Sequence, residues 1–298
     1  MASKVMVVVS VIVLIYIIST LLSSAIDLDA SDKIAIIPIT GIITPTETTF
    51  TFQQRTTTPS TIIEFLKTAE ANSRVKGIIL EINSPGGTVV ASKEIADAVK
   101  QSSKPVTALI KDLGTSGAYW IASAADIIVA DPLSITGSIG VTSSYLEFSK
   151  LFEEYGVTYE SLTAGKYKDI GSPYKELTQE ERTIIQKKLG KIHEAFIKEI
   201  AANRKIPEED VRALATGVYY LGEEAKELGL VDYLGNKDLA VSLTKEASSI
   251  KEANLITYKK ERTILDILSS LSMSSFYSFG VGMGEAKLHE LQQAVPHA

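Results

Sequence analysis

The 298-residue chain contains no cysteine and only three histidines, at positions 193, 289 and 297. The absence of cysteine excludes disulfide bonds, thiolate zinc sites and cysteine nucleophiles. The scarcity of histidine leaves few candidates for a histidine base. An excess of positive charge is also lacking, since the net charge is −6 at pH 7. The chain therefore has no basic balance suited to a phosphate backbone, and we expect no nucleic-acid partner.

Charge is absent from one stretch near the N-terminus, residues 5–26 (VMVVVSVIVLIYIISTLLSSAI). At about 1.5 Å per residue, a helix of this length spans about 33 Å, enough for a bilayer core of roughly 30 Å, so we expect a transmembrane anchor. A cleaved signal peptide is the alternative, because residues 23–25 are small. Lys4 precedes the stretch and acidic residues follow it. This favours a cytosolic tail at residues 1–4, a single pass through the cell membrane and an extracytoplasmic remainder.

The remainder of the chain alternates strand patterns with helix patterns. This alternation predicts an α/β fold built of right-handed βαβ units around a largely parallel sheet. Thr178 and Glu181 predict a capping box at the start of a helix. We expect one catalytic domain at residues 27–253 and a C-terminal tail of uncertain role at 254–298. The predicted strands are residues 33–40, 75–83, 105–110 and 126–130, and the predicted helices begin near residues 60, 89, 117 and 179.

Glycine- and serine-containing loops follow three of the predicted strands, at residues 84–87, 112–117 and 136–140. Because the carboxyl ends of parallel strands meet at one edge of a sheet, we expect these loops to lie together. The backbone N–H groups of Gly87 and Gly117 can then converge on one oxygen and form an oxyanion hole. Taken alone, the loop 84–87 is better explained as an ordinary strand-to-helix turn, and Ser116 as an ordinary helix N-cap.

Ser116, between a predicted strand and a predicted helix, is the candidate nucleophile. A serine nucleophile needs a base, and we interpret His193 as a solvated or half-buried helix residue. Lysine is the remaining option, since Ser–Lys pairs are a known variant of the catalytic triad. Residues 165–173 contain the plausible lysines, although most lysines are solvated surface charges. A neutral lysine requires an apolar pocket and an orienting hydroxyl, which Ser138 in the third loop could supply.

Five short motifs occur in a specific order: NSPGG at residues 83–87, SGAYWIA at 116–122, TGSIGV at 136–141, KYKD at 166–169 and GLVD at 229–232. In this order and spacing they resemble the signal peptide peptidase A family of serine proteases, which shares the fold of the Clp protease subunit and the crotonases. The resemblance covers most of residues 33–240.

The resemblance implies hydrolysis of peptide bonds without a metal or cofactor. It also implies a membrane anchor, a homo-oligomer with composite active sites, and remnant signal peptides as apolar, unfolded substrates. Lys166 is the nearby lysine that does not match the base of the family. The implied site residues are Ser116 as nucleophile, Lys168 as general base, Ser138 as the hydroxyl that orients the lysine, and Gly87 and Gly117 as oxyanion donors.

Two other functions fit parts of the sequence. An acyl-CoA hydratase or isomerase of the same fold would also use two oxyanion donors, but with a carboxylate as acid or base and no need for Ser116. A non-catalytic membrane scaffold that oligomerises through its α/β domain would need neither Ser116 nor Lys168.

Overall fold

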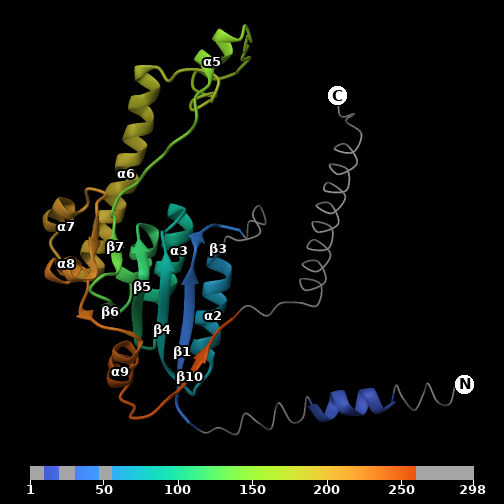
Figure 1. The fold of residues 1–298 in the computed structure, drawn as a ribbon, viewed down its shortest axis with the longest axis vertical. Helices are drawn as coiled ribbons and strands as arrows, with labels where there is room; N and C mark the ends of the chain where they lie inside the picture. The colour runs from blue at the N-terminus through green and yellow to red at the C-terminus, as the bar shows by residue number, and fades with distance from the viewer. Residues whose placement is uncertain (1–9, 20–30, 47–55, 260–298) are drawn as a thin grey trace, which may run out of the picture. The chain divides into compact units, whose positions relative to one another are not determined.

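The computed structural model describes residues 10–19, 31–46 and 56–259, and its central element is an eight-stranded sheet (Figure 1). The strands are β1 (Lys33–Thr40), β4 (Val75–Ser84), β5 (Val106–Thr115), β6 (Ile127–Ala130), β7 (Ile135–Gly137), β8 (Tyr219–Leu221), β9 (Tyr233–Leu234) and β10 (Asn254–Thr257). Their order is β10-β1-β4-β5-β6-β9, with β7 paired to β5 and β8 paired to β7. Only the β7–β8 pair of this sheet is antiparallel. The predicted α/β class with a largely parallel sheet is confirmed.

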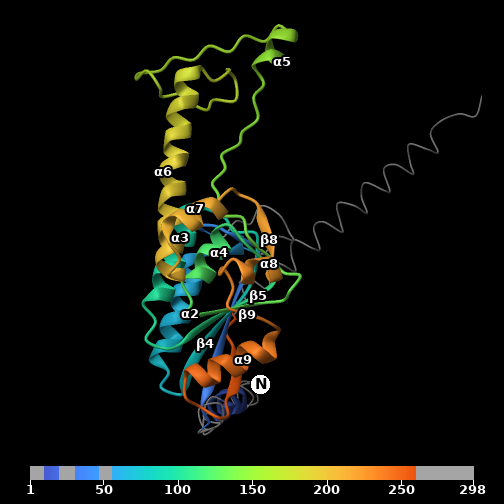
Figure 2. The same ribbon diagram turned by 90° about the vertical axis from the view of Figure 1, so that its left-hand side faces the viewer.

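Helices cover both faces of the sheet (Figure 2). One face packs against α2 (Pro59–Ala71), α3 (Val89–Lys100) and α4 (Gly117–Ser123), and the other packs against α9 (Lys237–Ala247). Strand β1 shows how one sequence serves two cores, because successive side chains of a strand point to opposite faces. Its alternate residues Ile34 and Ile36 join the α9 side, whereas Ala35, Ile37 and Ile39 join the other side.

A second, two-stranded parallel sheet lies beside the loop that follows β4. It consists of β2 (Ile42–Ile43) and β3 (Thr56–Thr57). Ile43 also forms a parallel bridge to Gly87. The chain after β1 is thereby attached to one of the two glycines that sequence analysis singled out.

One predicted strand and one predicted loop have different bounds in the structure. The predicted strand 105–110 continues as β5 to Thr115, because residues 113–115 pair with β7. The first residues of the predicted loop 136–140 belong to β7 itself. Residues 216–235 contain two short strands, β8 and β9, on either side of α8 (Gly222–Glu227). These pairings join segments far apart in the chain, which a local sequence pattern does not encode.

A long segment, residues 141–178, leaves the sheet after β7 and extends away from it (Figures 1 and 2). We call it the arm. It contains α5 (Ser149–Glu154), which has no buried residue, and returns to the N-terminal end of α6 (Gln179–Arg204). The predicted capping box of Thr178 and Glu181 is confirmed at that end. Helix α6 then runs back toward the sheet and is followed by α7 (Glu208–Leu214).

The predicted membrane anchor at residues 5–26 is described only in part. Residues 10–19 are helical, and the rest of that stretch lies outside the described residues. No helix among the described residues has both the length and the apolar character needed to cross a bilayer. Most of the predicted tail, from residue 260 onward, also lies outside the described residues, whereas residues 254–257 form β10.

Candidate active site

Ser116 occupies a sharp turn between β5 and α4. Its backbone has φ 53° and ψ −125°, which is rare for a residue with a side chain. Two hydrogen bonds hold this conformation: the Ser116 N–H donates to the Gly137 carbonyl at 2.8 Å, and the Trp120 N–H donates to the Ser116 carbonyl at 3.0 Å. Strand β7 and the first turn of α4 therefore hold the backbone of Ser116 from both sides. Strained turns of this kind occur at nucleophile positions.

The loop 84–87 packs directly against this turn. Gly86 has φ +93°, and a Cβ built on it would lie 3.0 Å from the Ser116 Cβ and 2.7 Å from the Gly117 nitrogen. A Cβ on Gly117 would lie 3.3 Å from the Gly87 nitrogen and 2.1 Å from the Ser92 Oγ. The structure thus brings Ser116, Gly87 and Gly117 together, at distances that leave no room for side chains on the glycines.

The backbone bonding leaves the N–H groups of Gly87 and Gly117 free for a ligand. In the bridge to Ile43, the Gly86 carbonyl and the Thr88 N–H make the two hydrogen bonds, each 2.9 Å long, so the N–H of Gly87 points to the opposite side. Gly117 is the first residue of α4, where an N–H has no partner within the helix. Within the described part of the chain, neither amide donates to another protein group. Two such donors can hold an oxyanion.

Ser116 opens into a cavity of about 490 Å³ that Ser138 also lines. The Ser138 Oγ donates a hydrogen bond to the Gly217 carbonyl at 3.0 Å, so its lone pairs remain available to accept one from an amine. Helix α6 supplies a wall through residues spaced at i, i+3, i+4 and i+7. These residues are Gln186, Leu189, Gly190 and His193.

His193 is half-buried on α6, in agreement with our interpretation from the sequence. Its ring also lines the cavity of Ser116, and its Nε2 is buried without a hydrogen-bond partner among the described residues. Sequence analysis did not place it there. The helical spacing from Gln186 to His193 was the available signal, but it does not reveal which way that face points.

Lys168 lies elsewhere in the chain. It is exposed on the arm and is not among the residues that line the cavity. Its neighbours Lys166 and Tyr167 bind Glu180 in the first turn of α6. The α6 residues that line the cavity follow Glu180 by 6 to 13 positions, or roughly 9–20 Å along the helix axis. The structure of one chain therefore brings Ser116, Ser138, Gly87 and Gly117 together but does not bring Lys168 to them.

The two lysines of the KYKD motif, Lys166 and Lys168, and the nearby Lys175 have different environments. The Nζ of Lys166 lies 2.9 Å from Glu180, and the Nζ of Lys175 lies 2.7 Å from Glu181 and 3.0 Å from Asp169. These carboxylates raise the pKa of both lysines, which keeps the amines protonated. Lys168 forms no side-chain hydrogen bond or ion pair within the described residues. Of the three lysines, Lys168 is therefore the one without a carboxylate partner among the described residues.

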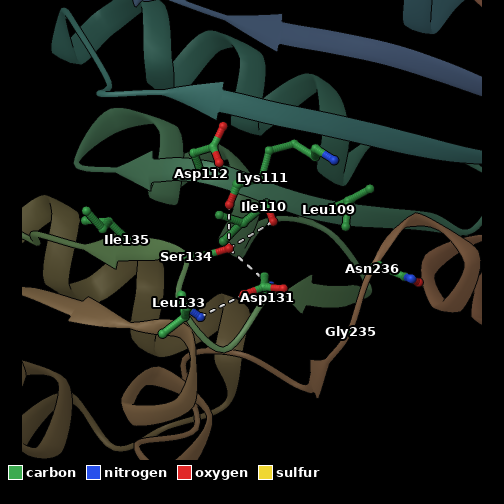
Figure 3. A pocket seen from close by; sticks show the side chains of 10 residues that line it. All are labelled: Leu109, Ile110, Lys111, Asp112, Asp131, Leu133, Ser134, Ile135, Gly235 and Asn236. Carbon is green, nitrogen blue, oxygen red and sulfur yellow. Dashed lines mark hydrogen bonds between the residues drawn. The ribbon is translucent and has the colours of Figure 1, made fainter.

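A second cavity, of about 360 Å³, lies between β5, the loop after β6 and the residues before α9 (Figure 3). Its serine, Ser134, is fully engaged by the fold. The Ser134 Oγ donates to the carbonyls of Ile110 and Lys111 and accepts from the Asp131 N–H at 3.1 Å. A hydroxyl with these partners is not poised as a nucleophile, so the cavity of Ser116 is the better candidate for the active site.

Comparisons with known proteins show the family of the chain. Residues 98–251 match the family model of Peptidase family S49, and residues 40–129 match that of Clp protease. A candidate protease of Methanocaldococcus jannaschii is 36 % identical over 225 residues, which cover 75 % of this chain and 72 % of that protein. A candidate signal peptide peptidase SppA of Enterococcus faecium is 33 % identical over 237 residues, covering 78 % of this chain and 69 % of that protein.

One solved structure, a mutant of the 1510-N membrane-bound stomatin-specific protease, aligns with a TM-score of 0.50. The alignment covers 78 % of this chain and 100 % of that chain, at 16 % sequence identity. At this identity the likeness concerns the fold alone.

Proposed function

The chain belongs to peptidase family S49 and is a serine peptidase, and from this premise we propose that Ser116 and Lys168 form its catalytic dyad. The main support for the proposal is that the strained Ser116 lies next to the backbone N–H groups of Gly87 and Gly117, which are free for a ligand. Lys168 takes the hydroxyl proton of Ser116, and the resulting alkoxide attacks the substrate carbonyl. The two amides stabilise the oxyanion. The lysine then returns the proton to the leaving amine, and water hydrolyses the acyl-enzyme.

The choice of Lys168 comes from the family resemblance, and its environment supports it. A lysine base must be neutral near pH 7, and both Lys166 and Lys175 are held in their charged form by carboxylates. Ser138 supports the same arrangement, because its hydroxyl lies in the cavity of Ser116 and can accept a hydrogen bond from the Lys168 amine.

Lys168 reaches Ser116 of a second copy of this chain in our proposal, since it is not in the cavity of its own chain. The arm that carries it exposes large apolar side chains that are typical of a subunit interface. Leu162 is 90 % exposed, Tyr155 75 % and Leu146 72 %. Burying this surface against a neighbouring copy would also take the lysine out of bulk water, as a lysine base requires.

We further propose that the substrates are remnant signal peptides in the membrane and that residues 5–26 anchor the chain there, with the catalytic domain outside the cytoplasm. The uncharged sequence of that stretch supports the anchor, and the name of the Enterococcus faecium relative supports the substrate class. Extraction of membranes at alkaline pH, combined with proteolysis from outside intact cells, tests the topology. Release of the full chain into the soluble fraction would contradict it.

Mixing two inactive variants tests the composite dyad. Ser116→Ala and Lys168→Ala should each abolish hydrolysis of an apolar fluorogenic peptide while the chain remains folded. After joint refolding, about one quarter of the sites combine an intact serine with an intact lysine from the neighbour, so activity should return to that level. A dyad within one chain would give no recovery. Activity in either single variant would reject the assigned residue.

A further inference from the structure

Lys168 sits in a short turn of the arm, residues 165–172, that we call the lysine turn. Three local backbone bonds close it: Lys168 N–H to the Gly165 carbonyl, Ile170 N–H to the Tyr167 carbonyl, and Ser172 N–H to the Asp169 carbonyl, at 3.0–3.2 Å. Such a turn has no ladder of helix or sheet bonds to define its orientation. Side-chain contacts with α6 therefore help to fix the position of the lysine turn.

The first contact lies on the N-terminal side of Lys168. The Nζ of Lys166 lies 2.9 Å from Glu180 Oε2 and 4.8 Å above the centre of the Tyr167 ring, and the Tyr167 hydroxyl donates to the same carboxylate. Both side chains of the ion pair are more than half exposed, so solvent weakens this contact.

The second contact lies on the C-terminal side and is less exposed. The Lys175 Nζ donates to Asp169 at 3.0 Å and to Glu181 at 2.7 Å, and so joins the lysine turn to α6. The Glu181 side chain is only 4 % exposed, and its other oxygen accepts from the Thr178 N–H at 2.9 Å in the capping box. Glu181 is therefore fixed by the helix terminus before it binds Lys175.

The geometry points to Lys175, Glu181 and Glu180 as positioning residues that fix the Lys168 amine for its reaction with Ser116. Glu180 binds Lys166 and Tyr167 directly, and Glu181 reaches Asp169 through Lys175. The Lys168 side chain itself has no partner among the described residues. This inference rests on the proposed role of Lys168. A base displaced by about 1 Å can lose roughly a hundredfold in rate, so this attachment matters for kcat.

The test compares variants of the full-length, assembled chain with an apolar fluorogenic peptide. Lys175→Met should lower kcat roughly tenfold to a hundredfold and leave KM nearly unchanged, because the lysine turn does not line the cavity of Ser116. Lys175→Arg should restore most of kcat, since a guanidinium can donate to both carboxylates. The matched control is Glu176→Gln, which breaks an exposed ion pair with Lys150 on the same arm and should leave kcat unchanged.

Two further variants separate the possible failures. Lys168→Ala should abolish hydrolysis altogether, because the positioning residues act only through Lys168. Activity of Lys168→Ala alone would reject the proposed dyad. A normal kcat in folded, assembled Lys175→Met would reject the positioning role alone. If Lys175→Met does not fold, Glu180→Gln at the exposed pair decides: a lowered kcat with unchanged KM supports the inference, and a normal kcat overturns it.

Discussion

At the scale of single residues, Ser116 combines strain with function. A side chain at φ 53° and ψ −125° is unfavourable, yet Gly137 and α4 hold the residue there, and Gly86 provides the space beside it. The packing around Ser116 offsets the free-energy cost of this conformation. The strain places the hydroxyl next to the amides of Gly87 and Gly117.

Two substitutions of Ser116 separate strain from chemistry. Both Ser116→Ala and Ser116→Gly should be inactive. Ser116→Gly should be the more stable by about 1–2 kcal/mol, because glycine adopts this conformation without a Cβ penalty. Chemical denaturation of the two variants under identical conditions checks the difference. Equal free energies of unfolding would show that the turn is not strained.

At the scale of elements, α6 joins three parts of the molecule. Its first turn holds the arm through Glu180 and Glu181, its middle lines the cavity of Ser116, and its last turns enter the core. In the core, the Phe196 ring stacks on Trp120 of α4 with ring centres 4.3 Å apart. Since α4 begins directly after Ser116, the helix that holds the arm also packs on the helix that fixes the nucleophile.

Gly190 of α6 offers a test of the cavity wall. It lies in the interior of the helix, and nothing lies within 4 Å of a Cβ built on it. Gly190→Ala should stabilise the chain by about 0.5–1 kcal/mol through the higher helix propensity of alanine. The new methyl group should also narrow the cavity and lower kcat/KM for peptides with the largest side chains. Thermal unfolding and a series of peptides that differ in one side chain measure the two effects.

The attachment of the arm to α6 should depend on pH in a defined window. Lys175 and the Thr178 N–H lower the pKa of Glu181, so the stabilisation is complete above the ordinary glutamate value of about 4.3 and is lost as the pH falls through the lowered pKa. The carboxylate of Glu181, and after it that of Asp169, raises the pKa of Lys175. The stabilisation that depends on protonated Lys175 is therefore complete below about pH 10.4 and is lost as the pH rises through the raised pKa.

Hydrogen exchange of residues 165–172 measures this attachment. Protection should be constant between about pH 5 and 10 after correction for intrinsic exchange rates, and should fall in stronger acid. In Glu181→Gln the acid dependence should be reduced. An acid response in the variant equal to that of the natural chain would contradict the assignment to Glu181.

Local sequence patterns predicted those helices and strands whose own residues show a clear apolar pattern. Strand β1 was predicted at residues 33–40 and lies at Lys33–Thr40, because its apolar side chains serve both faces of a buried strand. The end of β5 was missed, since Gly114 and Thr115 are typical of a loop and only their pairing with β7 makes them a strand. The order of strands and loops in the sequence also predicted that Ser116, Ser138 and the two glycines lie at one edge of the sheet. It did not reveal that Lys168 lies on an arm, because that arm has no apolar periodicity directed at the sheet.

At the scale of the whole molecule, the arm carries apolar surface that one chain leaves uncovered. Helix α5 contributes no buried residue, although it includes Leu151 and Phe152. An exposed apolar surface of this kind is typical of an interaction site. We propose a neighbouring copy as this partner, because it would also complete the proposed active site.

Replacement of exposed arm residues should weaken assembly and activity together. Leu146→Ser combined with Leu162→Ser removes apolar surface without disturbing a core, so the monomer should fold normally while the oligomer dissociates at higher protein concentrations. Sedimentation velocity and peptide hydrolysis measured on the same samples test this. Leu133→Ser is the control, because Leu133 is 75 % exposed but lies outside the arm. Unchanged assembly of the arm variant would reject the arm as the interface.

The bridge between Ile43 and Gly87 determines how position 87 responds to mutation. A Cβ there would lie 1.9 Å from the Ile43 carbonyl oxygen, a backbone atom that cannot rotate aside. In a library of all single-codon changes selected for hydrolysis, every replacement at position 87 should disappear, and no second change of side chain elsewhere should rescue it. Position 222 should show the same depletion, because its Cβ would lie 2.0 Å from the Asp131 carbonyl oxygen. Intolerance to mutation will therefore mark tight backbone crossings in this chain as strongly as it marks the residues that react.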